Sequence, residues 1–425
     1  MRRLTLLFLI PLLSLLIGTV PGVAPASGQS MPIDHVVVLM QENRSADTYF
    51  GQLCREGQPA FECEPKNASN PDPTSPGRKP IKAFHKTSYC ESADLNHSWN
   101  GAHQEYDNGA MDGFTAANVD PSDPTGSRTM GYYDQRDLPF YYGLYSTFAT
   151  SDRYFSSVLS QTFPNRFYLL AGTSFGHIRN DFPSADGFTQ KTIFEELDAA
   201  GISWRIYYNQ IPFAFEFKYV RDNAAGHVFP ISQYYIDAAN GTLPQVSYVD
   251  PIFVASANTE NDEHPPSNVQ VGERFVSDVT NALMSSPDWG SSAMFLTYDE
   301  WGGFYDHVAP PSAPVPDNIP PMLQPGDTPG AFDRYGFRVP VAVVSPYSRP
   351  HFVSHVVDDH TSILKFIETR FDLPPLTNRD AQADGMLGFF DFTHASFATP
   401  PTLPPAPIDP AQAAKCSTAP PNGGI

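Results

Sequence analysis

The chain has 425 residues, of which 41% are hydrophobic and 13% aromatic, which is enough for a large buried core. Its formal net charge of −20 argues against nucleic acid as a partner, because phosphate backbones are bound by basic surfaces. The same charge disfavours docking on strongly anionic membranes.

The N-terminus has the pattern of a secretory signal peptide over residues 1–26. Arg2 and Arg3 precede the apolar run 4–17, and Ala-Pro-Ala at 24–26 supplies a small-x-small cleavage signal. No later run is long and apolar enough to span a bilayer. We therefore expect a secreted protein, extracellular or periplasmic, with no transmembrane segment in its mature form.

Short apolar runs alternate with helical patterns along residues 27–398. Strands are predicted at 36–40, 202–208, 245–249, 294–298 and 339–344, and helices at 192–200, 274–284 and 362–371. This alternation predicts an α/β fold, a three-layer sandwich with a mostly parallel central sheet. We assign residues 27–398 to one catalytic domain.

Three segments interrupt the alternation. Residues 52–90 are polar, rich in proline and lysine, and read as a loop-rich insertion. Residues 309–332 contain many prolines and predict a long irregular loop, a kind of segment that is usually functional or mobile. Residues 399–425 form a proline-rich C-terminal tail, for which we expect extended chain.

Four cysteines, at positions 54, 63, 90 and 416, suit an exported chain. They allow three disulfide pairings, and the sequence alone does not choose among them. We favour Cys54–Cys63, which closes a short loop, together with Cys90–Cys416, which would hold the tail. Their spacing does not match a zinc site.

Two of the predicted strands end in paired oxygen ligands. Glu42 and Asn43 follow the first strand, and Asp299 and Glu300 follow the strand at 294–298. Because ligands of open α/β sheets collect beyond the carboxyl ends of strands, the two pairs predict one site for a divalent cation. The alternative is two unrelated acidic turns.

Thr162 lies at a predicted helix start, because Pro164 suits the first turn of a helix. A hydroxyl at that position meets backbone N–H groups that attract phosphate, and once deprotonated it can attack phosphorus. The alternative is that Thr162 only caps the helix.

Histidines supply the remaining candidates for proton transfer. His97, His103, His264 and His307 could each protonate a leaving oxygen or hold a phosphate oxygen. For each of them the alternative is a structural or surface histidine.

Taken together, these motifs resemble the bacterial phospholipase C and acid phosphatase phosphoesterases, a family that includes the plant non-specific phospholipases C. The matching segments are Glu-Asn-Arg-Ser at 42–45, Thr-Phe-Pro-Asn-Arg at 162–166, Asn-Asp-Glu-His-Pro at 261–265 and Tyr-Asp-Glu-Trp-Gly-Gly-Phe-Tyr-Asp-His-Val at 298–308, in the family's order. The chain departs from many relatives at Ala46 and Thr48, neither of which is a proposed ligand. The resemblance implies an alkaline phosphatase-like fold.

The resemblance also implies roles for individual residues. It implies that Thr162 is the nucleophile and a metal ligand, and that a histidine, His264, protonates the leaving alcohol. The other implied metal ligands are Glu42, Asn43, Asp299 and Glu300, and the implied phosphate-binding residues are His97, His103 and Asn165. The divalent metal stays open among calcium, magnesium, manganese, zinc and iron.

The function expected from the resemblance is a secreted, metal-dependent phosphoric ester hydrolase. The leading expectation is phospholipase C-type cleavage of a glycerophospholipid such as phosphatidylcholine, through a phosphothreonine intermediate and with transient contact with a membrane surface. Two alternatives stay open. One is a broad acid phosphatase acting on soluble phosphomonoesters, and the other is a non-catalytic exported binding protein.

Overall fold

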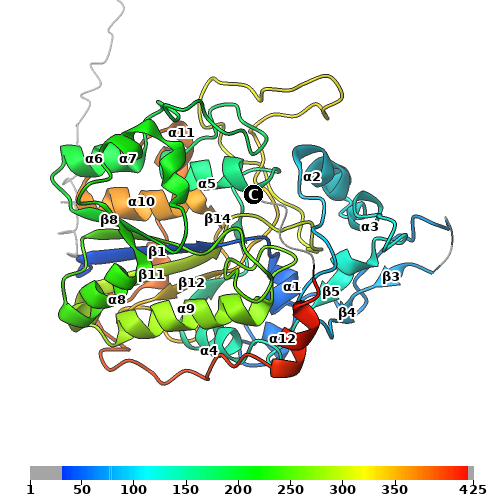
Figure 1. The fold of residues 1–425 in the computed structure, drawn as a ribbon, viewed down its shortest axis with the longest axis horizontal. Helices are drawn as coiled ribbons and strands as arrows, with labels where there is room; N and C mark the ends of the chain where they lie inside the picture. Colours follow the sequence, from blue (N-terminus) through cyan, green and yellow to red (C-terminus); the bar gives the residue numbers. More distant parts are fainter. Residues whose placement is uncertain (1–30, 76, 78, 420–425) are drawn as a thin grey trace, which may run out of the picture. The chain divides into compact units, whose positions relative to one another are not determined.

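An eight-stranded sheet lies at the centre of the computed structural model, which describes residues 31–75, 77 and 79–419 (Figure 1). The strand order is β13-β6-β12-β11-β1-β10-β8-β9. These strands are β1 (His35–Gln41), β6 (Ala149–Ser151), β8 (Trp204–Tyr208), β9 (Val228–Pro230), β10 (Val246–Asp250), β11 (Ser292–Tyr298), β12 (Val341–Val344) and β13 (Val353–Ser354). The predicted signal peptide, residues 1–26, lies outside the described residues.

The sheet is mostly parallel, as predicted. The five strands from β11 to β9 run parallel to one another, whereas β12 is antiparallel to both of its neighbours. Every residue of β1 after His35 is buried, because helices cover both faces of the sheet. The continuous apolar run that predicted this strand is the sequence signature of that burial.

Helices form the two outer layers, which confirms the predicted α/β sandwich. Figure 1 shows α5 (Thr162–Ala171), α6 (Ile193–Ala199), α10 (His360–Phe371) and α11 (Asn378–Gln382) on one side of the sheet, and α4 (Pro139–Thr147), α8 (Ile231–Asn240) and α9 (Val269–Met284) on the other. No described helix has the length and apolar character needed to cross a membrane.

Short α-helices and two-residue strands complete the fold, together with 3₁₀ turns and one further helix near the C-terminus that is described below. They are the helices α1 (Ala46–Phe50), α2 (Trp99–Tyr106), α3 (Phe114–Ala117) and α7 (Lys218–Asp222), with the two-residue strands β2 (Ser69–Asn70), β3 (Ile81–Lys82), β4 (Phe84–His85), β5 (Gly131–Tyr132), β7 (Tyr154–Phe155) and β14 (Asp358–Asp359). The strands pair as β2 with β3, β4 with β5, and β7 with β14. Residues 309–332 form no helix or multi-residue strand, as predicted for that loop.

The predicted helices and strands are confirmed with shifted ends. Helix α9 begins at Val269, five residues before the predicted start at 274, because the side chain of Asn268 accepts a hydrogen bond from the Gln270 amide and caps the helix there. Helices α2, α4, α5 and α8 lie in segments for which no helix bounds were predicted, although a helix start was expected near Thr162.

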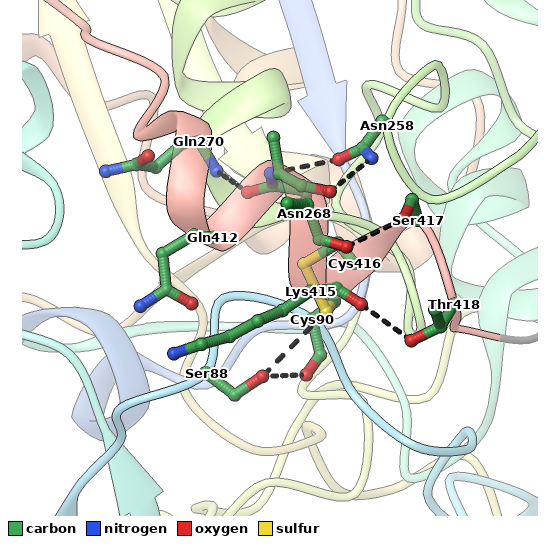
Figure 2. The surroundings of a disulfide bond; sticks show 12 residues. Ser88, Cys90, Asn258, Asn268, Gln270, Gln412, Lys415, Cys416, Ser417 and Thr418 are labelled. Carbon is green, nitrogen blue, oxygen red and sulfur yellow. Dashed lines mark hydrogen bonds between the residues drawn. A yellow bond between two sulfur atoms is a disulfide. The ribbon is translucent and has the colours of Figure 1, made fainter.

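Both favoured disulfides are present, Cys54–Cys63 and Cys90–Cys416. The second bond attaches the C-terminal segment to the loop that ends the 52–90 insertion (Figure 2). The expectation of an extended tail is wrong for α12 (Pro410–Cys416). Asp409 caps this helix and Pro410 occupies its first turn, a start signal that the proline-rich composition obscured.

Candidate active site

The carboxyl ends of β1 and β11 bring together the four paired oxygen ligands. The two strands are parallel neighbours, and Gln41 lies opposite Tyr298, so Glu42 and Asp299 leave the sheet side by side. The Asn43 amide donates a hydrogen bond to Asp299 Oδ1 over 3.2 Å. The side chains of Glu42, Asn43, Asp299 and Glu300 are all fully buried. The pairs that lie more than 250 residues apart in the sequence therefore meet at one edge of the sheet.

A close backbone contact shapes this edge. Asn43 has φ of +61° and Gly302 has φ of +66°. A Cβ atom added at Gly302 would lie 2.5 Å from the Asn43 carbonyl oxygen, so this turn needs glycine both for its conformation and for the close approach. The turn at Gly302 thus packs the chain directly against Asn43.

Helix α5 presents Thr162 and Arg166 to the same region. Thr162 is the first residue of the helix and is fully buried. Arg166, one turn later, lies 3.0 Å from Glu42 Oε1 through Nη2 and 3.2 Å from Asp299 Oδ2 through Nε. The arginine therefore connects the helix that carries the predicted nucleophile to both ligand-bearing strands.

The predicted metal ligands include buried oxygen atoms without a hydrogen-bond partner. These atoms are Oε2 of Glu42, Oδ1 of Asn43, Oγ1 of Thr162 and Oε1 of Glu300, whereas Oε1 of Glu42 makes the ion pair with Arg166. Buried polar atoms are normally hydrogen-bonded, so a group of unpartnered oxygens calls for a ligand. Carboxylate, amide and hydroxyl oxygens suit a hard divalent cation, and the residues present therefore fit such an ion.

Asp299 differs from the other predicted ligands. Its Oδ1 accepts hydrogen bonds from the amides of Asn43 and Glu300, at 3.2 and 2.7 Å, and its Oδ2 accepts one from Arg166. Asp299 therefore also holds the two strand ends in register. Its predicted role as a ligand would use the remaining lone pairs of these oxygens.

Burial and mutual repulsion raise the pKa values of Glu42 and Glu300. The pKa of Glu42 lies well above its ordinary value, chiefly because burial disfavours the charged form, and Asp299 adds repulsion that Arg166 offsets in part. The pKa of Glu300 is also well above its ordinary value, again from burial first and then from Asp299. A bound cation would remove this penalty on the carboxylates.

His97 and His264 form a pocket beside these acids. Their rings lie 5.7 Å apart, and His97 Nε2 lies 3.9 Å from Glu300 Oε1. His97 Nδ1 lies 2.8 Å from the Leu95 carbonyl oxygen and His264 Nδ1 lies 2.6 Å from that of Pro265. Since a carbonyl oxygen only accepts, both Nδ1 atoms carry a proton and both Nε2 atoms remain for a ligand.

The histidine pocket has a volume of about 300 Å³. Its lining includes both histidines, Gln161, which directly precedes Thr162, and Asn180. Asp94 also lines it, with Oδ2 3.6 Å from His97 Nδ1 and 3.8 Å from His264 Nε2. The pocket therefore joins the histidines to the start of the helix that carries the predicted nucleophile.

Two of the predicted phosphate-binding residues occupy different surroundings. His103 packs its ring on Trp99, at 4.2 Å between centroids, and lines a separate hollow of about 420 Å³. The structure therefore does not bring His103 into the histidine pocket. Asn165 bonds the loop before Thr162, with Oδ1 accepting from the Val158 amide and Nδ2 donating to three carbonyl oxygens. Its predicted contact with phosphate stays a prediction, and its hydrogen bonds give it a positioning role.

His307, the remaining sequence candidate, belongs to a buried ionic network away from the histidine pocket. Its Nδ1 lies 2.7 Å from Asp47 Oδ2, and Asp47 Oδ1 accepts from Arg338 at 3.0 Å. His307 Nε2 lies 3.4 Å from Glu62, next to the Cys54–Cys63 disulfide. The network gives His307 a structural role in holding the disulfide loop.

Glu263 is a positioning residue that the sequence did not reveal. Its buried carboxylate accepts hydrogen bonds from hydroxyl groups of three tyrosines and from one amide. The donors are Tyr49, Tyr141, Tyr298 (3.1 Å) and Gln41 (3.2 Å). Glu263, Tyr298 and Gln41 each directly precede a predicted site residue, so this one carboxylate ties three active-site segments together.

Arg166 and Asp94 were also missed as site residues. Arg166 lies four residues after Thr162, a spacing that places both on one face of a helix and could have indicated a shared site. Asp94 lies in an irregular loop, and its approach to His264 depends on a contact between segments 170 residues apart. No local pattern predicts such a contact.

The sequence of this chain is similar to a known family and to several named proteins. The phosphoesterase family model matches residues 33–374. "Phospholipase C B" of Mycobacterium tuberculosis is 35% identical over 435 residues, covering 89% of this chain and 81% of that protein. "Non-specific phospholipase C1" of Arabidopsis thaliana is 34% identical over 387 residues, covering 84% and 71%.

A solved structure from the alkaline phosphatase superfamily, of a Vibrio parahaemolyticus protein, also matches. It aligns with a TM-score of 0.42 and 9% identity, covering 83% of this chain and 69% of that chain.

Proposed function

The chain belongs to the phosphoesterase family and is a hydrolase of phosphoric esters, and on that premise we propose that it is a phospholipase C. The proposed reaction cleaves a glycerophospholipid such as phosphatidylcholine into diacylglycerol and a phosphorylated head group. Relatives named phospholipase C, in a bacterium and in a plant, support this substrate class.

The observation that carries the proposal is the set of buried oxygens without a hydrogen bond at the ends of β1 and β11 and at the start of α5. Glu42, Asn43, Thr162 and Glu300 each contribute at least one such atom, and we propose that they hold a divalent cation with Asp299. A cation bound there would lower the pKa of a neighbouring hydroxyl and polarise a phosphoryl oxygen.

In the proposed mechanism Thr162 is the nucleophile. Its Oγ1 loses its proton to solvent and forms a bond to phosphorus, while the bond from phosphorus to the diacylglycerol oxygen breaks. Backbone N–H groups at the start of the ten-residue helix α5 attract the negative phosphoryl oxygens. His264 Nε2, in the protonated ring, gives its proton to the departing oxygen.

A phosphothreonine intermediate follows, and water then resolves it. Neutral His264 takes a proton from the attacking water, whose oxygen bonds to phosphorus as the bond to Thr162 Oγ1 breaks. Thr162 regains a proton, and the phosphorylated head group leaves. His97 is proposed to hold a phosphoryl oxygen during both steps, and its Nε2, 3.9 Å from Glu300 Oε1, supports that proposal.

The protein is also proposed to act outside the cytoplasm. Its two disulfides are typical of an oxidising compartment. The alternative of a non-catalytic binding protein is not supported, because the chain belongs to a hydrolase family. The acid phosphatase alternative shares the same catalytic residues, so the choice of substrate separates the two.

The test compares phosphatidylcholine with p-nitrophenyl phosphate as substrates of the wild type, Thr162→Val and Thr162→Ser. Thr162 Oγ1 makes no hydrogen bond, so its loss in Thr162→Val should leave the melting temperature nearly unchanged. We expect kcat to fall at least about 10⁴-fold in Thr162→Val and far less in Thr162→Ser. Wild-type turnover by Thr162→Val would refute the nucleophile, and higher kcat/KM for p-nitrophenyl phosphate would favour the phosphatase alternative.

A further inference from the structure

An exposed apolar segment lies within the long proline-rich loop. We call residues 318–323, Asn-Ile-Pro-Pro-Met-Leu, the apolar tip. Three of its side chains remain exposed, Ile319 by 44%, Met322 by 46% and Leu323 by 42%. Large apolar side chains grouped on an exposed surface indicate an interaction site.

The whole loop lacks positive charge. Residues 309–332 contain two aspartates and no lysine, arginine or glutamate. Both aspartates are turned toward the protein, since Asp317 accepts a hydrogen bond from Thr173 and Asp327 pairs with Arg179. The surface that the tip offers is therefore apolar and uncharged.

The apolar tip is held in place. The Met322 amide donates a hydrogen bond of 2.8 Å to the Gly176 carbonyl oxygen, and Pro320 and Pro321 restrict the backbone between the exposed side chains. Figure 1 shows the loop, in yellow, extending beyond the helix layer that contains α5 and α11. A fixed segment of this kind loses little conformational freedom when it docks.

The base of the loop that carries the apolar tip borders a hollow beside the histidine pocket. Asp327 and Arg179 line a hollow of about 270 Å³ together with Gln161 and Asn180. Gln161 and Asn180 also line the histidine pocket, so the two hollows adjoin. The base of the loop therefore forms one wall of a hollow that adjoins the histidine pocket and includes Gln161, the residue before the predicted nucleophile.

A fourth exposed apolar side chain lies beside a residue that lines the same hollow. Phe182 is 68% exposed and follows Asp181, which lines the hollow. Its ring lies 5.1 Å from that of Phe163, the residue after Thr162. Two separate segments with exposed apolar side chains, the long loop and residues 181–182, thus border this hollow.

We propose that the apolar tip and Phe182 dock on the surface of a zwitterionic phospholipid bilayer, so that a lipid enters the active site from the membrane. This inference rests on the proposed phospholipase C activity and names the surface through which its substrate arrives. A net charge of −20 repels anionic lipid, whereas an uncharged apolar tip can bury its side chains at the interface of a neutral bilayer.

The test replaces Ile319, Met322 and Leu323 together by serine. The matched control is Ile236→Ser, because Ile236 is an isoleucine with 51% exposure on α8, in the opposite helix layer. Hydrolysis is measured on phosphatidylcholine vesicles and on monomeric dihexanoyl-phosphatidylcholine below its micelle concentration. Binding is measured by flotation with phosphatidylcholine vesicles in a Thr162→Val background, so that lipid is not consumed.

We expect the triple variant to lose about 10- to 100-fold in vesicle binding and vesicle hydrolysis, from the lost apolar burial. Its hydrolysis of the monomeric substrate should equal that of the wild type, and the control should be unchanged on both substrates. Equal vesicle binding by the triple variant and the wild type would overturn the inference. So would failure of the wild type to float with phosphatidylcholine vesicles, or tighter binding to phosphatidylglycerol vesicles.

The two proposals fail in different ways. If the wild type hydrolyses neither form of phosphatidylcholine, the proposed function is wrong, while flotation still reports whether the apolar tip binds a bilayer. If both forms are hydrolysed and the triple variant matches the wild type on vesicles, the phospholipase C activity stands and the docking surface is wrong.

Discussion

Replacing Arg166 by methionine should destabilise the protein strongly when no divalent metal is bound. Arg166 is buried and pairs with two buried carboxylates, Glu42 at 3.0 Å and Asp299 at 3.2 Å. Removing one partner of a buried ion pair costs about 3–5 kcal/mol, because the remaining charge is left uncompensated. For a unit of about 390 residues with about 2.1 cal/mol/K per residue, this corresponds to a melting temperature lower by about 4–6 °C.

Arg274→Met is the control, because Arg274 pairs with Asp278 one helical turn away and both side chains are more than half exposed. Arg274 also donates a hydrogen bond of 3.2 Å to the Ala406 carbonyl oxygen. The ion pair contributes about 0.5 kcal/mol and the hydrogen bond about 1 kcal/mol, together a shift of about 2 °C. Calorimetry of proteins treated with EDTA measures both variants, and a divalent salt is then added back. Because a cation would neutralise the acids that Arg166 leaves, the rise in melting temperature on metal addition should be larger in Arg166→Met than in the wild type. The reasoning is refuted if metal-free Arg166→Met loses no more stability than Arg274→Met.

Three further predictions concern the metal, the proton donor and the buried carboxylate. Treatment with EDTA should abolish activity, and a divalent salt should restore it. In titration calorimetry, Glu42→Gln should bind the ion at least about 10-fold more weakly than the wild type. Equal affinity would show that Glu42 is not a metal ligand. Burial is the main cause that lowers the pKa of His264; Asp94 raises this pKa and His97 lowers it. If the reaction needs protonated His264, kcat/KM should rise as the pH falls, with a midpoint below about 6.5. His264→Asn should remove that pH dependence and lower kcat about 10²- to 10⁴-fold, and an unchanged pH profile would contradict the assignment. Glu263→Gln should lower kcat about 10- to 100-fold with little change in KM. The reason is that Gln41 and Tyr298, which precede predicted ligands, lose the carboxylate that accepts hydrogen bonds from both. A wild-type kcat would show that this carboxylate does not position the ligands.

The pH dependence of stability at His264 has the same physical origin. Its pKa is lower in the folded protein than in the unfolded chain, so the unfolded chain binds the proton more tightly. The contribution of His264 to stability is therefore complete above about 6.5 and is lost as the pH falls through the folded-state value.

Local patterns predicted the elements whose burial is nearly complete. The apolar run of β1 identified a strand, because both faces of that strand are covered and nearly every residue is apolar. Strands β6, β9 and β13 have two or three residues each, too few for a periodic pattern, and their pairing depends on distant neighbours. Helix α12 was missed because its proline-rich surroundings outweighed the Asp409 cap.

The order of the motifs determined the family, and the match with the phosphoesterase family confirms it. The motifs also predicted that Glu42 and Asp299 would share an edge of the sheet, since each directly follows a strand. This prediction was possible because each of the two acids directly follows an apolar run that forms a buried strand, and the carboxyl ends of parallel strands meet at one edge of the sheet.

The tertiary structure alone decided which other side chains reach the site. Residue patterns alone treated the histidines alike, and the resemblance added His97, His103 and His264 to the site. In the structure His97 and His264 line one pocket, His103 packs on Trp99 elsewhere, and His307 holds a structural network. These differences arise from contacts between segments far apart along the chain, and no local sequence pattern predicts such contacts. The amino-acid sequence by itself thus determined the sheet, the family and the ligand-bearing strand ends, whereas folding decided the burial, the hydrogen bonds and the unpartnered oxygens that give those residues their chemistry.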